Sequence, residues 1–119
     1  MRDIENLFSI PVHASLISDN ENIQNEMTQA ISKIPCKTVD VWGGTHELST
    51  VNFDDNDIER FNLTHTEEMI REELKIYCEY IGFPMRDYDI TSWFSKFNPG
   101  DYGHVHTHGY ADISDILMC

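Results

Sequence analysis

Basic side chains are scarce in this chain: 8 lysines and arginines stand against 21 aspartates and glutamates, for a formal net charge of −13 in 119 residues. This excess of acid argues against nucleic acid or an anionic membrane as a partner. No apolar run approaches the roughly 20 residues that a membrane span needs, and the first five residues, MRDIE, lack the hydrophobic core of a signal peptide. We therefore expect a soluble, cytoplasmic protein.

Cysteine is also scarce. The three cysteines (Cys36, Cys78 and Cys119) are widely spaced and form no CxxC pattern, which indicates free thiols rather than a disulfide framework. The hydrophobic share of 40% argues against wholesale disorder, and the length suits a single domain over residues 1–119.

Helical spacing of apolar residues predicts two helices. Asp19 or Asn20 can cap the first, over 21–34, and its apolar stripe consists of Ile23, Met27, Ile31 and Ile34. The second helix is predicted to begin at a capping box formed by Thr64 and Glu67. Its inward face is predicted to hold Met69, Ile70, Leu74, Tyr77, Cys78 and Ile81, and Gly82 and Pro84 end it.

Extended segments are predicted over 7–17, 37–42 and 90–98, from their β-branched and aromatic content or their alternation. The acidic run 54–57 reads as a solvated loop, and Pro99-Gly100-Asp101 reads as a turn. Because strands and helices are mixed along the chain, an α+β fold is expected.

Three histidines alternate after that turn, in the motif His104-Val105-His106-Thr107-His108. A strand points residues i, i+2 and i+4 to one face, so the motif is a candidate metal or phosphoryl-transfer site. The other histidines (His13, His46 and His65) are scattered and are interpreted as surface residues, and Trp42 and Trp93 as core residues.

Three chemistries use closely spaced histidines on a strand. A histidine-triad nucleotide hydrolase expects large apolar residues where this chain has Thr107 and Gly109, and the metallo-β-lactamase pattern needs Asp and His where it has Tyr110 and Ala111. A mononuclear non-haem iron site takes two ligands from one strand and leaves positions open for 2-oxoglutarate and O₂. This iron-site chemistry explains more of the chain, because an aromatic strand, a Pro-Gly turn and a ligand strand follow one another here.

With these motifs, the chain resembles the N-terminal part of the 2-oxoglutarate/Fe(II)-dependent oxygenases of phage and marine bacterial genomes. The resemblance rests on Leu7-Phe8-Ser9-Ile10-Pro11, on the aromatic segment around Trp93, and on the spacing of His106 and His108 to Ser114. It implies a hydroxylase-type dioxygenase with Fe(II) and 2-oxoglutarate, the latter a small-molecule cosubstrate. The implied fold is a pair of helices packed on the opening strands of an incomplete double-stranded β-helix, which is a jelly-roll or cupin-like architecture.

The resemblance also implies site residues. His106 and His108 would be the first two iron ligands, with His104 a neighbouring group or, in an alternative register, a ligand itself. Asn98 stands where prolyl-hydroxylase-like relatives use a tyrosine to bind the oxoglutarate carboxylate. No His, Lys or Arg follows His108, although the family places its distal histidine and its oxoglutarate-binding basic residue later.

The sequence therefore predicts a truncated, inactive oxygenase portion. The alternative is a non-catalytic metal-binding or interaction fragment that associates with itself through unpaired strands.

Overall fold

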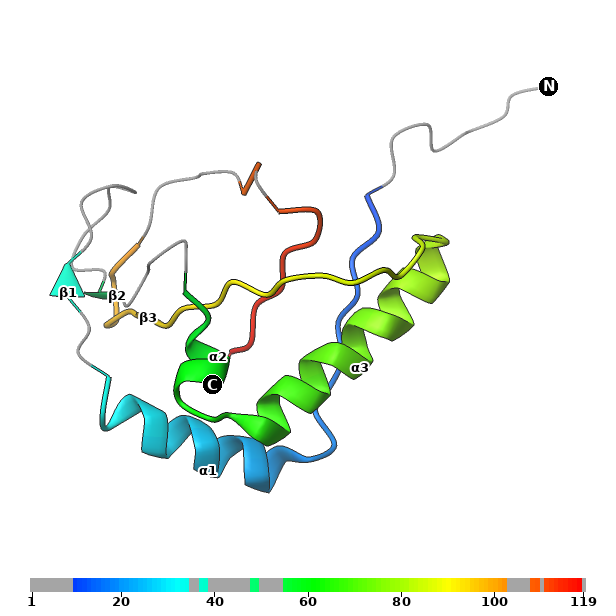
Figure 1. The fold of residues 1–119 in the computed structure, drawn as a ribbon. Helices are drawn as coiled ribbons and strands as arrows, with labels where there is room; N and C mark the ends of the chain where they lie inside the picture. The colour runs from blue at the N-terminus through cyan, green and yellow to red at the C-terminus, as the bar shows by residue number, and fades with distance from the viewer. Residues whose placement is uncertain are drawn as a thin grey trace.

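The computed structural model describes residues 10–34, 37–38, 48–49, 55–102, 108–109 and 111–118. Helices dominate these residues: α1 (Asn20–Ile31), α2 (Asp57–Arg60) and α3 (Thr64–Ile81). Three strands of two residues each, β1 (Lys37–Thr38), β2 (Leu48–Ser49) and β3 (Ser95–Lys96), pair antiparallel in the order β1-β2-β3. The start of α3 lies against α1, α2 sits above that junction, and the strands lie beyond the far end of α1 (Figure 1).

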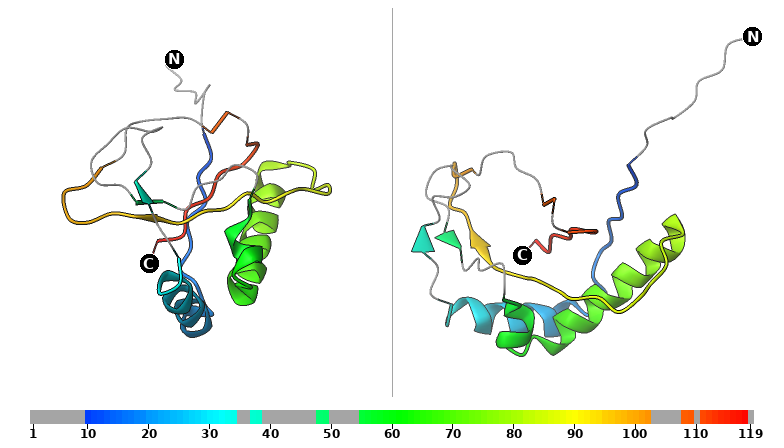
Figure 2. Two further views of the ribbon diagram at one scale, coloured as in Figure 1. Left: turned by 60° about the vertical axis from the view of Figure 1, so that its left-hand side comes forward. Right: turned by 45° about the horizontal axis from the view of Figure 1, so that its top comes forward.

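The predicted α+β fold with an incomplete double-stranded β-helix is wrong for the described residues, which are mainly helical. Strand pairing is limited to Lys37 with Ser49, Thr38 with Leu48, Leu48 with Lys96, and Ser49 with Ser95. The expected strand at 10–17 runs as extended chain along α3 instead (Figure 2), and the expected strand at 90–98 is reduced to the two residues of β3. Pro11 and His13 of the first segment bind α3, and Ser92 of the second binds the start of α2.

The first predicted helix is confirmed as α1, although it ends at Ile31 instead of Ile34. Ile23 and Met27 are buried as predicted, but Ile31 is 56% exposed and Ala30 takes the inward position. Asp19 is the N-cap residue, yet its carboxylate makes no cap hydrogen bond. It accepts one from the Asn22 side chain at 2.7 Å.

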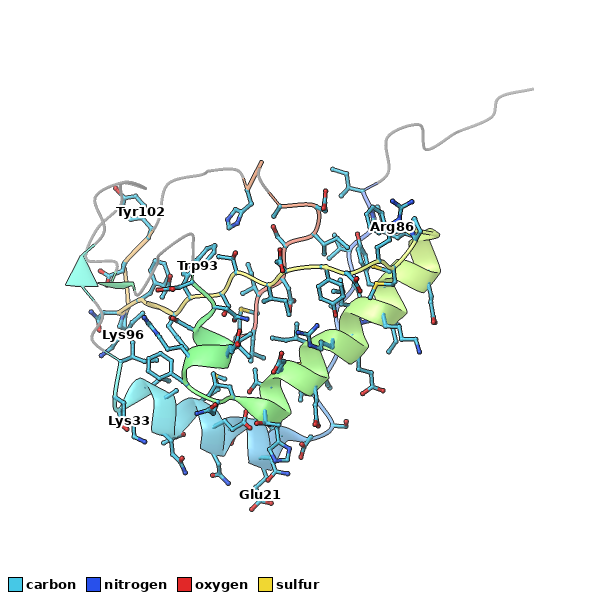
Figure 3. The ribbon with its side chains drawn as sticks, viewed as in Figure 1. Glu21, Lys33, Arg86, Trp93, Lys96 and Tyr102 are labelled. Atoms are coloured by element: carbon cyan, nitrogen blue, oxygen red, sulfur yellow. The ribbon has the colours of Figure 1, made fainter. Side chains whose placement is uncertain are left out.

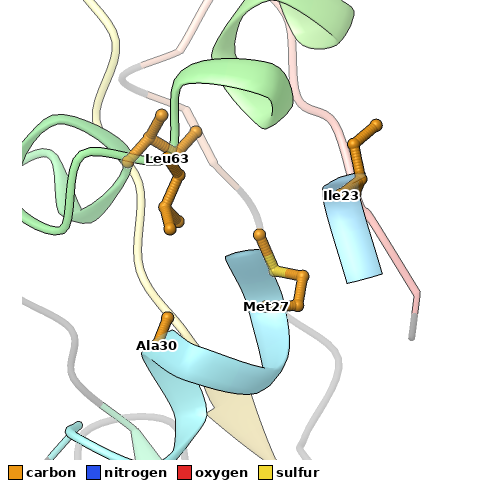
Figure 4. Packing of buried hydrophobic residues seen from close by; sticks show 5 residues of the cluster. Ile23, Met27, Ala30 and Leu63 are labelled. Atoms are coloured by element: carbon orange, nitrogen blue, oxygen red, sulfur yellow. The ribbon is translucent and has the colours of Figure 1, made fainter. Parts of the chain in front are cut away.

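The core is small and joins all three helices (Figure 4). Its buried members come from α1, α2 and the link between α2 and α3: Ile23, Met27, Ala30, Ile58 and Leu63. Partly buried side chains as far apart in sequence as Ile17 and Leu117 pack around this cluster, so segments distant in sequence meet at the core. Burial of this apolar surface is the main force that holds the short helices together.

The second predicted helix is confirmed as α3, Thr64–Ile81, and it ends directly before the predicted stop signal Gly82. Cys78 is 1% exposed, and the other five residues of the predicted inward face are half-buried. Gly82 ends the helix in the left-handed conformation at φ 71°, and the Phe83 amide donates to the Cys78 carbonyl at 2.9 Å. This geometry is a Schellman motif, in which glycine has no steric penalty.

The predicted capping box of α3 is wrong. The N-cap residue is Leu63, which has no capping side chain, and Glu67 pairs with Arg71 one turn later at 2.9 Å. The carboxylate of Glu26 on α1 instead accepts from the backbone amides of His65 and Thr66, at 2.7 and 2.9 Å, and from the Thr66 hydroxyl at 2.7 Å. A side chain of one helix therefore fills the N-terminal donors of the other.

The run 54–57 is not the solvated loop expected from its charge, as far as it is described. Asp57 begins the short helix α2 and is only 1% exposed, with one carboxylate oxygen 2.7 Å from the Arg60 guanidinium. A neighbouring cation within the same helical turn makes burial of this aspartate possible.

The predicted free thiol is confirmed for Cys78, which is buried; Cys36 and Cys119 lie outside the described residues. No helix in the described part of the chain is both long enough and apolar enough to cross a membrane.

Candidate functional site

The segment that leads to the histidine motif is fixed to α2 by Ser92. Its hydroxyl accepts from the Ile58 amide at 3.0 Å and donates to the Asn56 side-chain oxygen. Its backbone carbonyl accepts from the Asp57 amide at 3.2 Å, and its amide donates to the Asp55 carbonyl at 3.3 Å. Ser92 therefore supplies the N-terminal partner that α2 lacks locally, as Glu26 does for α3.

The next two residues place their rings on different partners. Phe94 packs against the core and meets Phe61 edge to face, with ring centroids 6.4 Å apart. Trp93 is half-buried and stacks on His108, with centroids 5.6 Å apart and planes inclined by 14°. Figure 3 shows Trp93 above α2, on the side of the molecule that carries Lys96 and Tyr102. The prediction of Trp93 as a core residue is therefore only partly right, because its ring is half-buried and contacts the histidine.

The turn predicted before the motif is confirmed. Asp101 donates its amide to the Asn98 carbonyl at 2.9 Å, and Gly100 has φ 88°. Proline second and a positive-φ glycine third are the pattern of a type II turn. The Asp101 carboxylate accepts from the Asn98 amide at 2.8 Å, so it holds the turn closed.

Asn98, the predicted oxoglutarate contact, is exposed in this turn. Ser114, whose distance from His106 and His108 supported the resemblance, is also exposed and lies in irregular chain.

Of the predicted metal ligands, the structure describes only His108, which is half-buried and lies outside any strand. His104 and His106 lie outside the described residues, as do His46 and Trp42. Within the described ranges, no three His, Cys, Asp or Glu side chains gather in a way that could hold a metal ion. The structure thus brings His108 to Trp93 and leaves the arrangement of the three histidines as a prediction.

The residues present fit a metal better than they fit 2-oxoglutarate. Three imidazoles in alternation are suitable donors for Fe, Zn, Ni or Cu. Oxoglutarate binding needs a cation for its carboxylate, and the predicted contact at Asn98 offers none. The side chain at position 98 is a neutral amide on an exposed turn.

A pair that the sequence reasoning missed lies on the outer side of α3. His13 and Glu73 approach to 2.5 Å, and the Tyr77 hydroxyl donates to the Pro11 carbonyl at 2.9 Å. The His13 imidazole holds the pKa of the Glu73 carboxyl below its ordinary value. These contacts attach the extended segment 10–17 to α3, beside an open hollow of about 250 Å³ lined by Pro11, Val12, His13, Tyr77 and Tyr80.

His65 makes a similar contact at the start of α3, with Asp19 at 3.1 Å. Both His13 and His65 are exposed, as predicted, but each bridges segments 46 or more residues apart. Partial burial raises the pKa of Glu26 nearby, yet hydrogen bonds from Thr66 and His65 outweigh it and leave that pKa below its ordinary value. Only contacts distant in sequence create these pairs, so no local motif could have revealed them.

Comparison with protein-family models, with curated proteins and with solved structures found no match to this chain.

Proposed function

We propose that this chain binds a divalent transition metal through its histidine motif, residues 104–108, in a site of the 2-oxoglutarate- and Fe(II)-dependent dioxygenase type. The observation that supports it is the stack of His108 on Trp93, at 5.6 Å. This contact places the end of the motif against the tryptophan segment with which the resemblance pairs it. His106 and His108 are the proposed ligands, and His104 is a neighbouring or alternative one.

Fe(II) with 2-oxoglutarate would supply O₂ activation in such a site. The contribution of this chain is narrower: its histidines hold the metal, and the turn at 98–101 sets the path of the chain toward them. Residues 109–119 contain no His, Lys or Arg, whereas the oxygenases that the chain resembles place a distal histidine and an oxoglutarate-binding basic residue after this motif. For a polypeptide of these 119 residues we expect metal uptake without oxoglutarate turnover.

The test is anaerobic equilibrium dialysis of the 119-residue chain against Fe(II), followed by a metal count and an assay of oxoglutarate decarboxylation. The double variant His106→Ala/His108→Ala should lose most of the bound metal. The matched control, His13→Ala/His65→Ala, removes the same number of imidazoles from described surface positions and should keep it. Equal metal content in both variants would contradict the proposed ligands, and turnover by the wild-type chain would contradict the expected lack of catalysis.

A second candidate, self-association without catalysis, is favoured by the extended segment 10–17. Ile10, Val12 and Leu16 are 86%, 86% and 99% exposed, while the alternate residues Pro11 and His13 contact α3. This segment contains no Asp or Glu in a chain of net charge −13, so like-charge repulsion between two copies is low along it. The proposed occupant of this apolar face is therefore the same segment of a second copy.

Light scattering after size-exclusion chromatography tests this second candidate. A concentration-dependent dimer should become a monomer in Val12→Lys/Leu16→Lys, whereas Ile116→Lys, a change at another residue that is 83% exposed, should leave it intact. A wild-type monomer at high concentration would exclude this dimer.

A further inference from the structure

The stack of Trp93 on His108 connects the histidine motif to the segment that follows α3. The two ring planes are nearly parallel, with an angle of 14° between them, and the ring centroids are 5.6 Å apart. Both are half-buried, and the turn at 98–101 lies between them in sequence. Aromatic rings at this separation attract each other through their faces, beyond the area they bury.

Trp93 is held on both sides along the chain. Ser92 is bonded to the amides and side chains at the start of α2, and Phe94 packs against the core and Phe61. The backbone at Trp93 is therefore fixed by contacts to the best-packed part of the molecule. Its indole is therefore held in place on the side of the ring that faces His108.

We propose that Trp93 is a positioning residue for metal binding at His108. A metal ion binds imidazole in the ring plane, through the lone pair of a ring nitrogen, whereas the indole occupies the face of the ring. The stack therefore restricts the orientation of the imidazole ring without occupying its plane. A ligand that is oriented before the metal arrives loses less rotamer entropy on binding.

This inference rests on the proposed metal function and has its own readout. The chain has two tryptophans, so in the variant Trp42→Phe all tryptophan fluorescence comes from Trp93. Ni(II) quenches an indole that it approaches closely, and a metal on His108 would lie beside the Trp93 ring. Titration with Ni(II) should therefore quench the emission of this variant with the same midpoint as the metal uptake measured by dialysis.

Two substitutions at position 93 test whether the Trp93 ring orients the His108 imidazole or only lies near the metal. Trp93→Leu removes the flat partner and should weaken Ni(II) binding by about tenfold, in the range seen when groups that orient a ligand are removed. Trp93→Phe keeps a flat ring and should restore most of the affinity. Circular dichroism and the urea midpoint show whether either variant has lost the helical fold.

The outcomes separate the two proposals. Metal uptake without quenching, or equal Ni(II) affinity for Trp93→Leu and wild type when both are folded, would overturn the positioning role and leave the metal site intact. Absence of metal uptake by the wild-type chain would overturn both. Quenching that disappears in His108→Ala, together with weaker binding in Trp93→Leu and recovery in Trp93→Phe, is the result expected.

Discussion

The helical region, residues 20–34 and 55–82, and the histidine region, residues 92–102 with 108–109, are packed very differently. The helical region contains every side chain that is buried among the described residues, including the polar Asp57 and Thr66. In the histidine region the best-covered side chains, among them Trp93, Phe94 and His108, are only half-buried. Ser92 and Phe94 make contacts that join the two regions.

This difference teaches where stability and chemistry lie. Regions with few buried contacts open at lower free energy than a packed core, and binding sites are commonly drawn from them. The helical region thus serves as the support, and the histidine region depends on it through a small number of hydrogen bonds and ring contacts. Substitutions that act on one region, on the other, or on their connection should have effects of different size.

The largest expected effect comes from the core of the helical region. Ile23→Ala, at a side chain that is 2% exposed, should lower the free energy of unfolding by about 2–4 kcal/mol, through lost burial and the cavity left behind. Ile31→Ala removes the same atoms from an exposed position of the same helix and should change it by less than about 0.5 kcal/mol. Urea unfolding followed by circular dichroism measures both. Equal losses would mean that the helix faces are assigned wrongly.

The next effect tests the cap between helices. Glu26→Ala should cost about 1–2 kcal/mol, because the amides of His65 and Thr66 lose a charged acceptor at a helix N-terminus. Gln24→Ala, an exposed polar residue on the same helix, is the control. Amide hydrogen exchange should become faster at His65 and Thr66 in the first variant only. Unchanged exchange there would show that Glu26 does not cap α3.

A smaller effect is expected at the connection between the regions. Ser92→Ala removes the hydroxyl that accepts from the Ile58 amide and should cost about 1 kcal/mol. Thr91→Ala, at the exposed neighbour, should cost less. Because Ser92 fixes the backbone next to Trp93, Ser92→Ala should also broaden the NMR signals of the Trp93 indole. A sharp, unshifted indole signal would show that the two regions are held together by other contacts.

The smallest effect is the pH dependence of the helical region. The pKa values of Glu26 and Glu73 are both lowered in the folded chain, so their ionised forms stabilise it at neutral pH. That stabilisation is complete above their unfolded pKa, near 4.5, and is lost as the pH falls through the lower folded values. The urea midpoint should therefore fall between about pH 6 and about pH 3, less steeply in Glu26→Gln/Glu73→Gln. An identical slope in this double variant would assign the acid sensitivity to other carboxyls.

The sequence predicted the helices far better than their surroundings. The C-terminal end of α3 follows from periodicity and from Gly82, because a left-handed C-terminus is encoded locally. The caps of α2 and α3 could not be predicted, since Ser92 and Glu26 lie 34 and about 40 residues from the amides they bind. The same reason explains the failed β-helix: an apolar extended segment packs equally well on a sheet or on a helix.

For the candidate site, local pattern identified the turn and the histidines. It predicted the turn at 98–101 because proline and glycine each fix a backbone angle there. It did not reveal that Trp93 and His108 would stack, because that contact depends on how the chain returns after the turn. The helical contacts of His13 and His65 were missed for the same reason.

The most direct test of the central claim is an NMR titration of the six histidine side chains with Zn(II), observed through their imidazole nitrogens. The account predicts that the resonances of His106 and His108 shift as metal binds, with His104 following if it is the neighbouring ligand. Those of His13 and His65, which are paired with carboxylates on the helices, should stay in place. Shifts confined to His13 or His65, or no shift at all, would contradict the account.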